Sequence, residues 1–292
     1  MVLETVKELI AAFDDATGVP GCFGYIVIAW LVVLGHYIVN SGSSTSKNEP
    51  NDSTVEKEEE EEPQRNFTFA QLKEFDGTND EKTGEPKPVY LSLDGAVFDV
   101  SGGRNFYGPG GPYENFAGHE CGVALAKMSL DTEHLDDLEG CSKLNFGEKT
   151  ELESWVQKFT YFRGYPVKGR LVPDTVLDKL KDRKLTKADI ASFNGRGDEV
   201  PEGYGTAPIY LGASGKVYDV SFGGMTFYGK DGGYNRFAGL DASRALAKMS
   251  FDPEDAASSN VDDLDDKEKK VLADWIKTFE QRKKYPIVGV LE

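Results

Sequence analysis

The stretch FYGPGGPYENFAG, residues 106–118, returns later in the chain as FYGKDGGYNRFAG, residues 227–239. Each version places two tyrosines around a glycine-rich turn: Tyr107 and Tyr113 in the first, Tyr228 and Tyr234 in the second. Glycines permit positive φ and close backbone approach, so the loop itself has a structural explanation. The tyrosines either close a core or line a binding site, and the loop alone leaves both interpretations open.

The repetition extends through the chain from residue 66 with an offset of about 120 positions. The matching pairs are YLSLDGAVFDVSGG with YLGASGKVYDVSFGG, VALAKMSLD with RALAKMSFD, LESWVQKF with LADWIKTF, and YPVKGRL with YPIVGVL. Two units of this size are too few and too large for a solenoid. The pattern therefore predicts a duplicated domain, with copy one at residues 66–172 and copy two at residues 182–292.

Each copy predicts the same small α+β domain, in which short helices gather on one side of a mixed sheet. Asp94-Gly95 and Ser214-Gly215 are two-residue hairpin signals between short strands. Thr68 and Thr186 are candidate N-caps of an early helix. A later helix carries an apolar stripe, and a final strand begins at each Tyr-Pro pair. The stripe residues are predicted core: Leu152, Trp155, Val156 and Phe159, then Leu272, Trp275, Ile276 and Phe279.

Residues 22–39, CFGYIVIAWLVVLGHYIV, contain no formal charge and approach the length of a membrane-spanning helix. Tyr25 and Tyr37 lie near its ends, where interfacial aromatic residues belong. The preceding segment, residues 1–21, is acidic, whereas a cleaved signal peptide has a positive start and a shorter apolar core. A single-pass transmembrane anchor is therefore predicted, with a signal peptide and a buried helix as the alternatives.

Residues 40–65 form a polar, serine-rich and then glutamate-rich segment without apolar periodicity. Such a composition predicts a disordered, self-repelling linker that holds the folded part away from the membrane. An acidic docking tail is the alternative. The whole chain carries a net charge of −17 and no cluster of lysine and arginine, so nucleic acid is excluded as a predicted partner.

The cysteines and histidines indicate neither a disulfide framework nor a metal site. The three cysteines are Cys22, Cys121 and Cys141, an odd number that favours a reducing compartment. The three histidines, His36, His119 and His134, have no metal-ligand spacing. His119 aligns with Leu240 of copy two and His134 lies in an acidic loop, so both are predicted to be surface residues.

The segment FDVSGGRNFYGPGGPYENFAG, followed by ALAKMS, resembles the membrane-associated progesterone receptor (MAPR) family, a branch of the cytochrome b5-like haem/steroid-binding fold. DASRALAKMS in copy two is equally typical of that family. The resemblance covers both copies, and the anchor with its acidic linker matches the family's layout. It implies two tandem cytochrome b5-like domains after an N-terminal transmembrane helix, although most members resembling this chain carry one domain.

The resemblance implies that ferric haem b binds through a tyrosinate, with as many as one haem per domain. In the family, the second tyrosine of the motif ligates iron, which falls on Tyr113 and Tyr234. The first, Tyr107 or Tyr228, lines the same pocket. A Lys-Tyr pair before the last strand also contacts haem, which Lys284 and Tyr285 match; copy one has Gly164 and Tyr165, with Arg163 before them.

The chemistry of the phenol agrees with that implied role. A free phenol has a pKa near 10 and ligates only where a strong cation displaces its proton. Ferric iron is such a cation, and tyrosine is a known axial haem ligand. Bis-histidine ligation, as in true cytochrome b5, would need two histidines per domain, which neither copy has.

Three classes of function follow from the resemblance. The first is a membrane-anchored haem-binding adaptor or haem donor for haem-dependent enzymes such as cytochromes P450. The second is a steroid- or sterol-binding receptor component without bound haem, because an apolar pocket for haem also suits a flat sterol. The third is a catalyst or electron carrier, but no nucleophile–base pair is visible and no catalytic residue is predicted, so a non-enzyme is favoured.

The location of the protein is only weakly encoded. Few basic residues flank the apolar run, so the positive-inside bias is small. The cysteine usage favours a cytosolic position for the part after the anchor. A single-pass protein of the endoplasmic reticulum or another endomembrane, with its tandem domains facing the cytosol, is therefore predicted.

Overall fold

The computed structural model describes residues 63–197 and 199–292, which include both repeated segments. Copy one contains, in chain order, β1 (Arg65–Phe67), α3 (Phe69–Leu72), β2 (Tyr90–Leu93), β3 (Ala96–Asp99), η1 (Ser101–Gly103), α4 (Arg104–Tyr107), η2 (Glu114–Phe116), α5 (Gly122–Ala126), η3 (Thr132–His134), α6 (Leu138–Cys141), α7 (Phe146–Gln157), η4 (Lys158–Phe162) and β4 (Val167–Leu171). The helix α8 (Asp174–Asp178) follows it.

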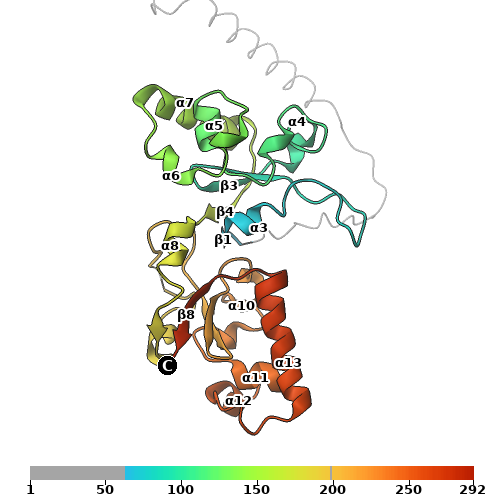
Figure 1. Ribbon diagram of the computed structural model, residues 1–292, viewed down its shortest axis with the longest axis vertical. Coiled ribbons are helices and arrows are strands. Elements are labelled where there is room, and N and C mark those ends of the chain that lie inside the picture. Colours follow the sequence, from blue (N-terminus) through green and yellow to red (C-terminus); the bar gives the residue numbers. More distant parts are fainter. Residues whose placement is uncertain (1–62, 198) are drawn as a thin grey trace, which may run out of the picture. The chain divides into compact units, whose positions relative to one another are not determined.

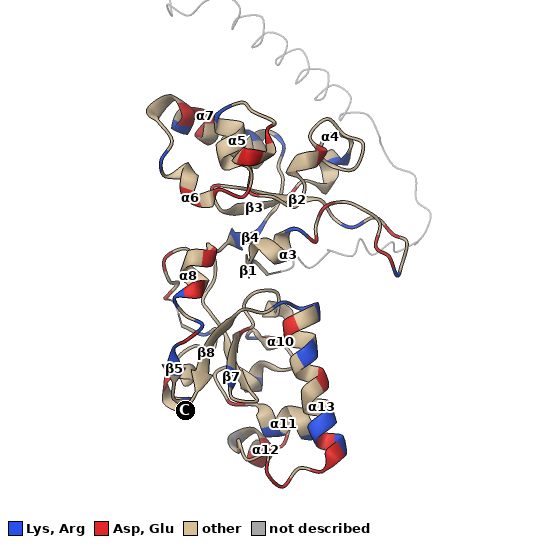
Figure 2. Ribbon diagram, viewed as in Figure 1, with Lys and Arg blue, Asp and Glu red and all other residues tan. Residues whose placement is uncertain are grey.

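Copy two repeats the strands and most of the helices in this order, with α12 in the place of η3 and without counterparts of η1 and α6 (Figure 1). Its elements are β5 (Lys184–Leu185), α9 (Lys187–Ala191), β6 (Tyr210–Ala213), β7 (Lys216–Asp219), α10 (Met225–Tyr228), η5 (Asn235–Phe237), α11 (Ser243–Lys248), α12 (Pro253–Ala257), α13 (Asp266–Lys277), η6 (Thr278–Arg282) and β8 (Ile287–Leu291). Acidic and basic positions are mixed along α13 rather than segregated by sign (Figure 2).

Each copy forms its own mixed sheet of four strands. The order is β1-β4-β3-β2 in copy one and β5-β8-β7-β6 in copy two. The first strand of each copy runs parallel to the last, and the other neighbours are antiparallel. The register shifts between Val97 and Phe98, and between Val217 and Tyr218, so even the irregularity of the sheet is repeated.

The predicted hairpins are present at the predicted turns. Asp94 and Gly95 have φ of 49° and 80°, and Ser214 and Gly215 have φ of 53° and 77°. Two successive positive φ values characterise the type I′ turn, whose twist matches that of the strands it joins. The turn residues therefore set the register of β2 with β3 and of β6 with β7.

The helices lie on both faces of each sheet, which corrects the expectation that they gather on one side. In copy one, Leu91 and Phe98 pack on one face with residues of α5 and α7, whereas Tyr90 and Val97 pack on the other with Leu72 of α3. Alternate residues of a strand face opposite ways, so the strands bury both faces. Figure 1 shows α5 and α7 on the side of β3 away from α3.

The predicted helix caps and apolar stripes are also present. Thr68 and Thr186 each accept a hydrogen bond from the backbone N–H three residues later and complete a capping box with Gln71 and Asp189. Leu152, Phe159, Leu272 and Phe279 are buried, and the tryptophans and the β-branched stripe residues pack against them. The stripe is therefore core, as expected.

Buried polar side chains join copy one to copy two. Asn66 of β1 is fully buried; its amide nitrogen donates to the Ser221 hydroxyl at 2.8 Å, and its Oδ1 accepts from the backbone N–H of Gly205 at 2.7 Å. Gln71 of α3 donates to the carbonyl oxygens of Phe222 and Lys283, each at 2.7 Å. The first strand and helix of copy one thus contact three segments of copy two, which lie before β6, after β7 and before β8.

The predicted anchor at residues 22–39 lies outside the described residues, as do residues 40–62 of the linker predicted at 40–65; Arg65, its last residue, begins β1. Within the described part, no helix combines the length and the apolar character that a bilayer crossing requires.

Candidate functional site

The glycine-rich loop folds back on itself in the same way in both copies. The backbone N–H of Tyr113 donates to the carbonyl of Phe106 at 2.9 Å, and that of Tyr234 donates to Phe227 at 2.9 Å. A Cβ on Gly111 would lie 2.5 Å from the carbonyl oxygen of Phe106. The close approach needs glycine, and it brings the second tyrosine of the motif beside the first.

In copy one the two tyrosines of the motif join a cluster of rings. The ring centroids of Tyr107 and Tyr113 are 5.9 Å apart. Tyr107 also lies 5.9 Å from Phe159 and 6.4 Å from Tyr165, and Tyr113 lies 5.9 Å from Phe116. Tyr107, Tyr113 and Tyr165 are all half-buried. The structure therefore brings these predicted site residues together, with their rings partly open to solvent.

A π-helical turn delivers the third tyrosine to the cluster. After α7, the segment Lys158–Phe162 continues as a π-helix, and the N–H of Tyr165 donates to the carbonyl of Phe159 at 3.0 Å. A Cβ on Gly103 would lie 2.4 Å from the Tyr165 hydroxyl, so glycine provides the room for this phenol. The π-turn and Gly103 were missed in the sequence; the SGG and FGG triplets that precede the tyrosine motif in both copies were the available signal.

The surroundings of Tyr107 in copy one shift the pKa of its phenol. Burial raises the pKa of Tyr107 to about 12, the nearby Tyr165 adds to this, and the positive charge of Arg163 opposes it. Arg163 is exposed, and its Cζ lies 5.8 Å from the ring centroid of Phe106, at the edge of the cluster. The predicted basic residue of copy one is thus placed beside the tyrosines.

In copy two the same tyrosines are packed more tightly. The Tyr228 and Tyr234 ring centroids are 5.8 Å apart, but Tyr228 is 4% exposed and Tyr285 is 5% exposed. Burial raises the pKa of Tyr228, and it raises that of Tyr285 to about 12. Tyr234 also contacts Phe251, at 5.5 Å between ring centroids, and Trp275, at 6.1 Å. The part played by Phe251 was not anticipated from the sequence.

The two lysines before β8 have different partners. The Nζ of Lys284 forms an ion pair with Glu74 of copy one at 2.6 Å. Lys283, which aligns with Arg163, lies over Phe227 at 5.2 Å, as Arg163 lies over Phe106. Lys284 also has φ of 51° where copy one has Gly164 at 61°. Lys283 is therefore the structural counterpart of Arg163, and Lys284 is engaged with the other copy.

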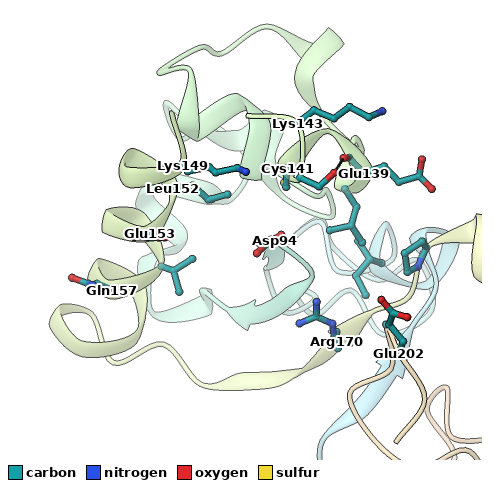
Figure 3. Close-up of a pocket in the computed structure, with 16 residues that line it drawn as sticks. Asp94, Glu139, Cys141, Lys143, Lys149, Leu152, Glu153, Gln157, Arg170 and Glu202 are labelled. Atoms are coloured by element: carbon teal, nitrogen blue, oxygen red, sulfur yellow. Dashed lines mark hydrogen bonds between the residues drawn. The ribbon is translucent and has the colours of Figure 1, made fainter. Parts of the chain in front are cut away.

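A separate cavity of about 910 Å³ lies among α6, α7 and β4 (Figure 3). None of the predicted tyrosines lines it, and its charged residues are of both signs, including Asp94, Glu139, Lys143 and Arg170. Cys141 reaches its wall, and burial raises the pKa of Cys141 and of Cys121 well above the ordinary value. Both thiols are free and held in the protonated form, so neither is a reactive cysteine.

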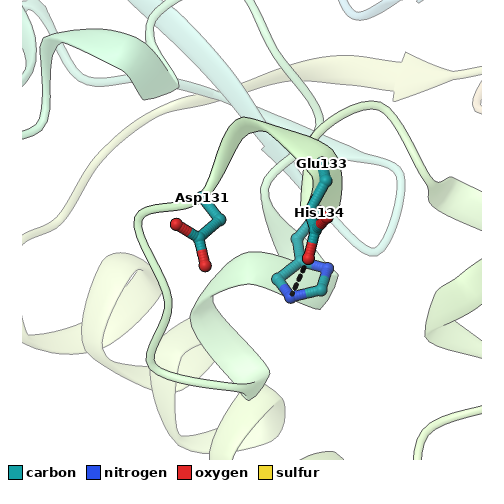
Figure 4. A group of neighbouring side chains, drawn as sticks. All are labelled: Asp131, Glu133 and His134. Carbon is teal, nitrogen blue, oxygen red and sulfur yellow. Dashed lines mark ion pairs between the residues drawn. The ribbon is translucent and has the colours of Figure 1, made fainter.

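Two histidines of copy one have local partners. His119 lies 3.0 Å from Asp136 through Nδ1; burial works against ionisation of Asp136, but hydrogen bonds from His119 and Lys73 hold its pKa at about 2. His134 lies 3.7 Å from the exposed Glu133, with Asp131 nearby (Figure 4). Both histidines are half-buried rather than fully exposed.

The residues at the tyrosine sites fit a haem by their chemistry. Phenol oxygens can supply an anionic ligand, aromatic rings can face a flat macrocycle, and Arg163 or Lys283 can face a propionate. In copy two, a cavity of about 70 Å³ remains among Tyr234, Phe237, Phe251 and Trp275, which is too small for a haem. Small-molecule pockets typically measure about 300–1,000 Å³.

Comparison with known proteins agrees with the duplication. The family model of the "Cytochrome b5-like Heme/Steroid binding domain" matches twice, at residues 68–171 and 186–292. The Cytochrome P450 regulator dap1 of Schizosaccharomyces pombe is 39% identical over 126 residues, which cover 41% of this chain and 71% of that protein. Probable steroid-binding protein 3 of Arabidopsis thaliana is 42% identical over 107 residues, covering 36% of this chain and 97% of that protein. Membrane-associated progesterone receptor component 2 of Homo sapiens is 34% identical over 125 residues, covering 42% of this chain and 52% of that protein.

Proposed function

Because the chain belongs to the family of the cytochrome b5-like heme/steroid binding domain, we propose that it binds ferric haem b through Tyr113 and Tyr234. The observation that carries this proposal is the ring cluster, in which a second tyrosine stands beside a buried or half-buried first tyrosine in each copy. No histidine pair occupies an equivalent position among the described residues, so the phenol is the available ligand.

The residues around each phenol support defined roles. Tyr107 and Tyr228 have raised pKa values and stay protonated at neutral pH, so each can donate a hydrogen bond within the site. Arg163 in copy one and Lys283 in copy two lie at the edge, where a cation can meet a propionate. A bound ferric haem would supply a Lewis-acidic iron that displaces the phenol proton, and the anionic oxygen would favour the ferric state.

We further propose a binding role rather than a catalytic one. The relatives include a protein named as a cytochrome P450 regulator, which supports an adaptor or haem donor for haem-dependent membrane enzymes. A single-pass anchor at residues 22–39 in the endoplasmic reticulum or another endomembrane, with the tandem domains in the cytosol, completes this proposal. The proposed domains remain residues 66–172 and 182–292.

A steroid or sterol is the second candidate ligand, in a receptor component without bound haem. Two relatives have names that refer to steroid binding or to a progesterone receptor. Phe237, Leu246 and Trp275 give the copy two cavity the apolar lining that a sterol requires, but this cavity of about 70 Å³ must open before it can hold the ring system.

Titration of the full chain with haemin, followed by absorption spectroscopy, tests the haem proposal. We expect Tyr113→Phe to abolish binding at one site and Tyr234→Phe at the other, and the double variant to bind none. The spectrum should be that of high-spin ferric haem that resists mild reductants. Tyr161→Phe is the matched control, because Tyr161 is 80% exposed.

If the double variant still binds two haems with an unchanged spectrum, the tyrosines are core residues and not ligands. Saturable displacement of a labelled sterol in a chain that takes up no haemin would instead favour the second candidate.

A further inference from the structure

Phe251 covers the second tyrosine of copy two. It follows α11, and its ring centroid lies 5.5 Å from that of Tyr234. It stacks on Phe237 at 5.5 Å with an interplanar angle of 2°. Phe251 nevertheless remains 45% exposed, so one face of the ring packs on the site while the other meets solvent. An exposed apolar ring in this position can leave the site without disrupting the core.

Arg236 holds Phe251 in place by two contacts. Its Nη1 donates to the carbonyl oxygen of Phe251 at 2.7 Å, and its Cζ lies 5.5 Å from the centroid of the Phe251 ring. The first contact fixes the backbone, and the second is a cation–π interaction with the side chain. Arg236 comes from η5, two residues after Tyr234, so the same short segment carries the phenol and the residue that retains its cover.

Copy one has neither part of this arrangement. Leu130 aligns with Phe251 and is 55% exposed, and Asn115 aligns with Arg236. Leucine offers no ring to stack on Phe116, and asparagine offers no cation. The two copies therefore differ in the cover of the second tyrosine, although their tyrosine motifs are nearly identical.

We infer that Phe251, retained by Arg236, closes the second tyrosine site to a large planar ligand and makes copy one the tighter site. The inference rests on the proposed function and assigns a specificity-determining role to Phe251. With Phe251 in place, the remaining cavity of about 70 Å³ admits no macrocycle. The Phe251 ring must move before the ligand reaches Tyr234. The apparent affinity of this site is therefore reduced in proportion to the fraction of molecules in which the ring is displaced.

The test measures each site separately in the full chain. Tyr113→Phe leaves the copy two site for titration with haemin, and Tyr234→Phe leaves the copy one site. In the first background, Phe251→Leu installs the copy one residue and should lower the dissociation constant of the copy two site about tenfold, as expected for loss of one aromatic stacking arrangement. Arg236→Asn should also lower the dissociation constant of the copy two site, because the variant keeps Phe251 but removes the two contacts that hold it in place.

A readout without haemin accompanies the titration. Trp275 lies 6.1 Å from Tyr234, beside the covered phenol. We expect Phe251→Leu to increase the quenching of tryptophan fluorescence by acrylamide in the ligand-free chain, since the cover is gone. Phe146→Leu is the control for haemin that adsorbs to exposed rings, because Phe146 is 88% exposed and lies in copy one.

The outcomes separate this inference from the proposed function. If the copy one site in the Tyr234→Phe chain takes up no haemin, the haem proposal itself fails. Suppose that the copy one site binds haemin. If Phe251→Leu and Arg236→Asn then leave the dissociation constant of the copy two site within twofold of its parent, or leave that site unable to bind, Phe251 is not the barrier. Unchanged quenching in Phe251→Leu would likewise show that the ring does not cover the site.

Discussion

Asp219 and Asp99 occupy equivalent positions at the ends of β7 and β3, but their surroundings differ. Asp219 is completely buried, and its Oδ1 accepts hydrogen bonds from the Ser221 hydroxyl at 2.6 Å and the Ser221 N–H at 3.0 Å. Burial raises the pKa of Asp219 to about 6, although these hydrogen bonds oppose the rise. Asp99 is half-buried and lies 4.0 Å from Lys168. The same residue type thus has different electrostatics in the two copies.

The pKa of Asp219 leads to a prediction about pH and stability. A carboxyl with a raised pKa in the folded state contributes stability that is present below its ordinary pKa of 3.8 and lost as the pH rises through about 6. The rise in pKa from 3.8 to about 6 corresponds to a loss of at most about 3 kcal/mol in the free energy of unfolding once Asp219 is ionised. We therefore expect Asp219→Asn, which cannot ionise, to gain stability relative to the parent chain between pH 4 and pH 7, as measured by urea unfolding.

The amide oxygen of Asp219→Asn can still accept the hydrogen bonds from Ser221. The difference in stability between this variant and the parent chain therefore reports the ionisation of the Asp219 carboxyl. Asp99→Asn is the matched control, because Asp99 occupies the equivalent position in copy one, where it is half-buried beside Lys168. A stability difference between Asp219→Asn and the parent that is constant from pH 4 to pH 7 would contradict the prediction.

At the scale of elements, Gly232 and Gly233 in the loop between α10 and η5 differ in the space that surrounds them. A Cβ on Gly232 would lie 2.1 Å from the carbonyl oxygen of Phe227, whereas a Cβ on Gly233 would meet no atom within 4 Å. We expect Gly232→Ala to destabilise the chain by about 1–3 kcal/mol, the usual cost of overpacking. Gly233→Ala should stay within about 0.5 kcal/mol of the parent.

Thermal unfolding of the two alanine variants, under identical conditions, measures this contrast. Equal stabilities would show that the loop relaxes freely around residue 232. The loop carries the N–H of Tyr234 to Phe227, so Gly232→Ala should also weaken any binding at the copy two tyrosine more than Gly233→Ala does.

At the scale of the whole molecule, Asn66 couples the two copies. Its buried side-chain amide donates a hydrogen bond to the Ser221 hydroxyl and accepts hydrogen bonds from the backbone N–H groups of Gly205 and Thr206. We expect Asn66→Ala to cost about 2–3 kcal/mol or more, because several buried polar groups lose their partner. Calorimetry should then show that a single unfolding transition of the parent chain separates into two.

The control is Asn235→Ala, since that amide is partly exposed and bonds only within its own copy, to the carbonyl of Lys230 at 2.8 Å. Two separate transitions already present in the parent chain would show that the buried contacts do not couple the copies.

The amino-acid sequence was enough to predict the duplication, the α+β class, the hairpin turns, the helix caps and the pair of tyrosines in each copy. These features are local, because they follow from the φ values that Gly95 and Ser214 adopt, from the hydroxyls of Thr68 and Thr186, and from apolar periodicity. The tertiary structure decided which side chains meet. It placed Lys283 rather than Lys284 over the loop phenylalanine, put Phe251 over Tyr234, and buried Asn66 against copy two. Such contacts join residues from separate elements, and their formation depends on how sheets and helices pack rather than on local preference. The two similar tyrosine motifs therefore became different sites, because different neighbours surround their tyrosines.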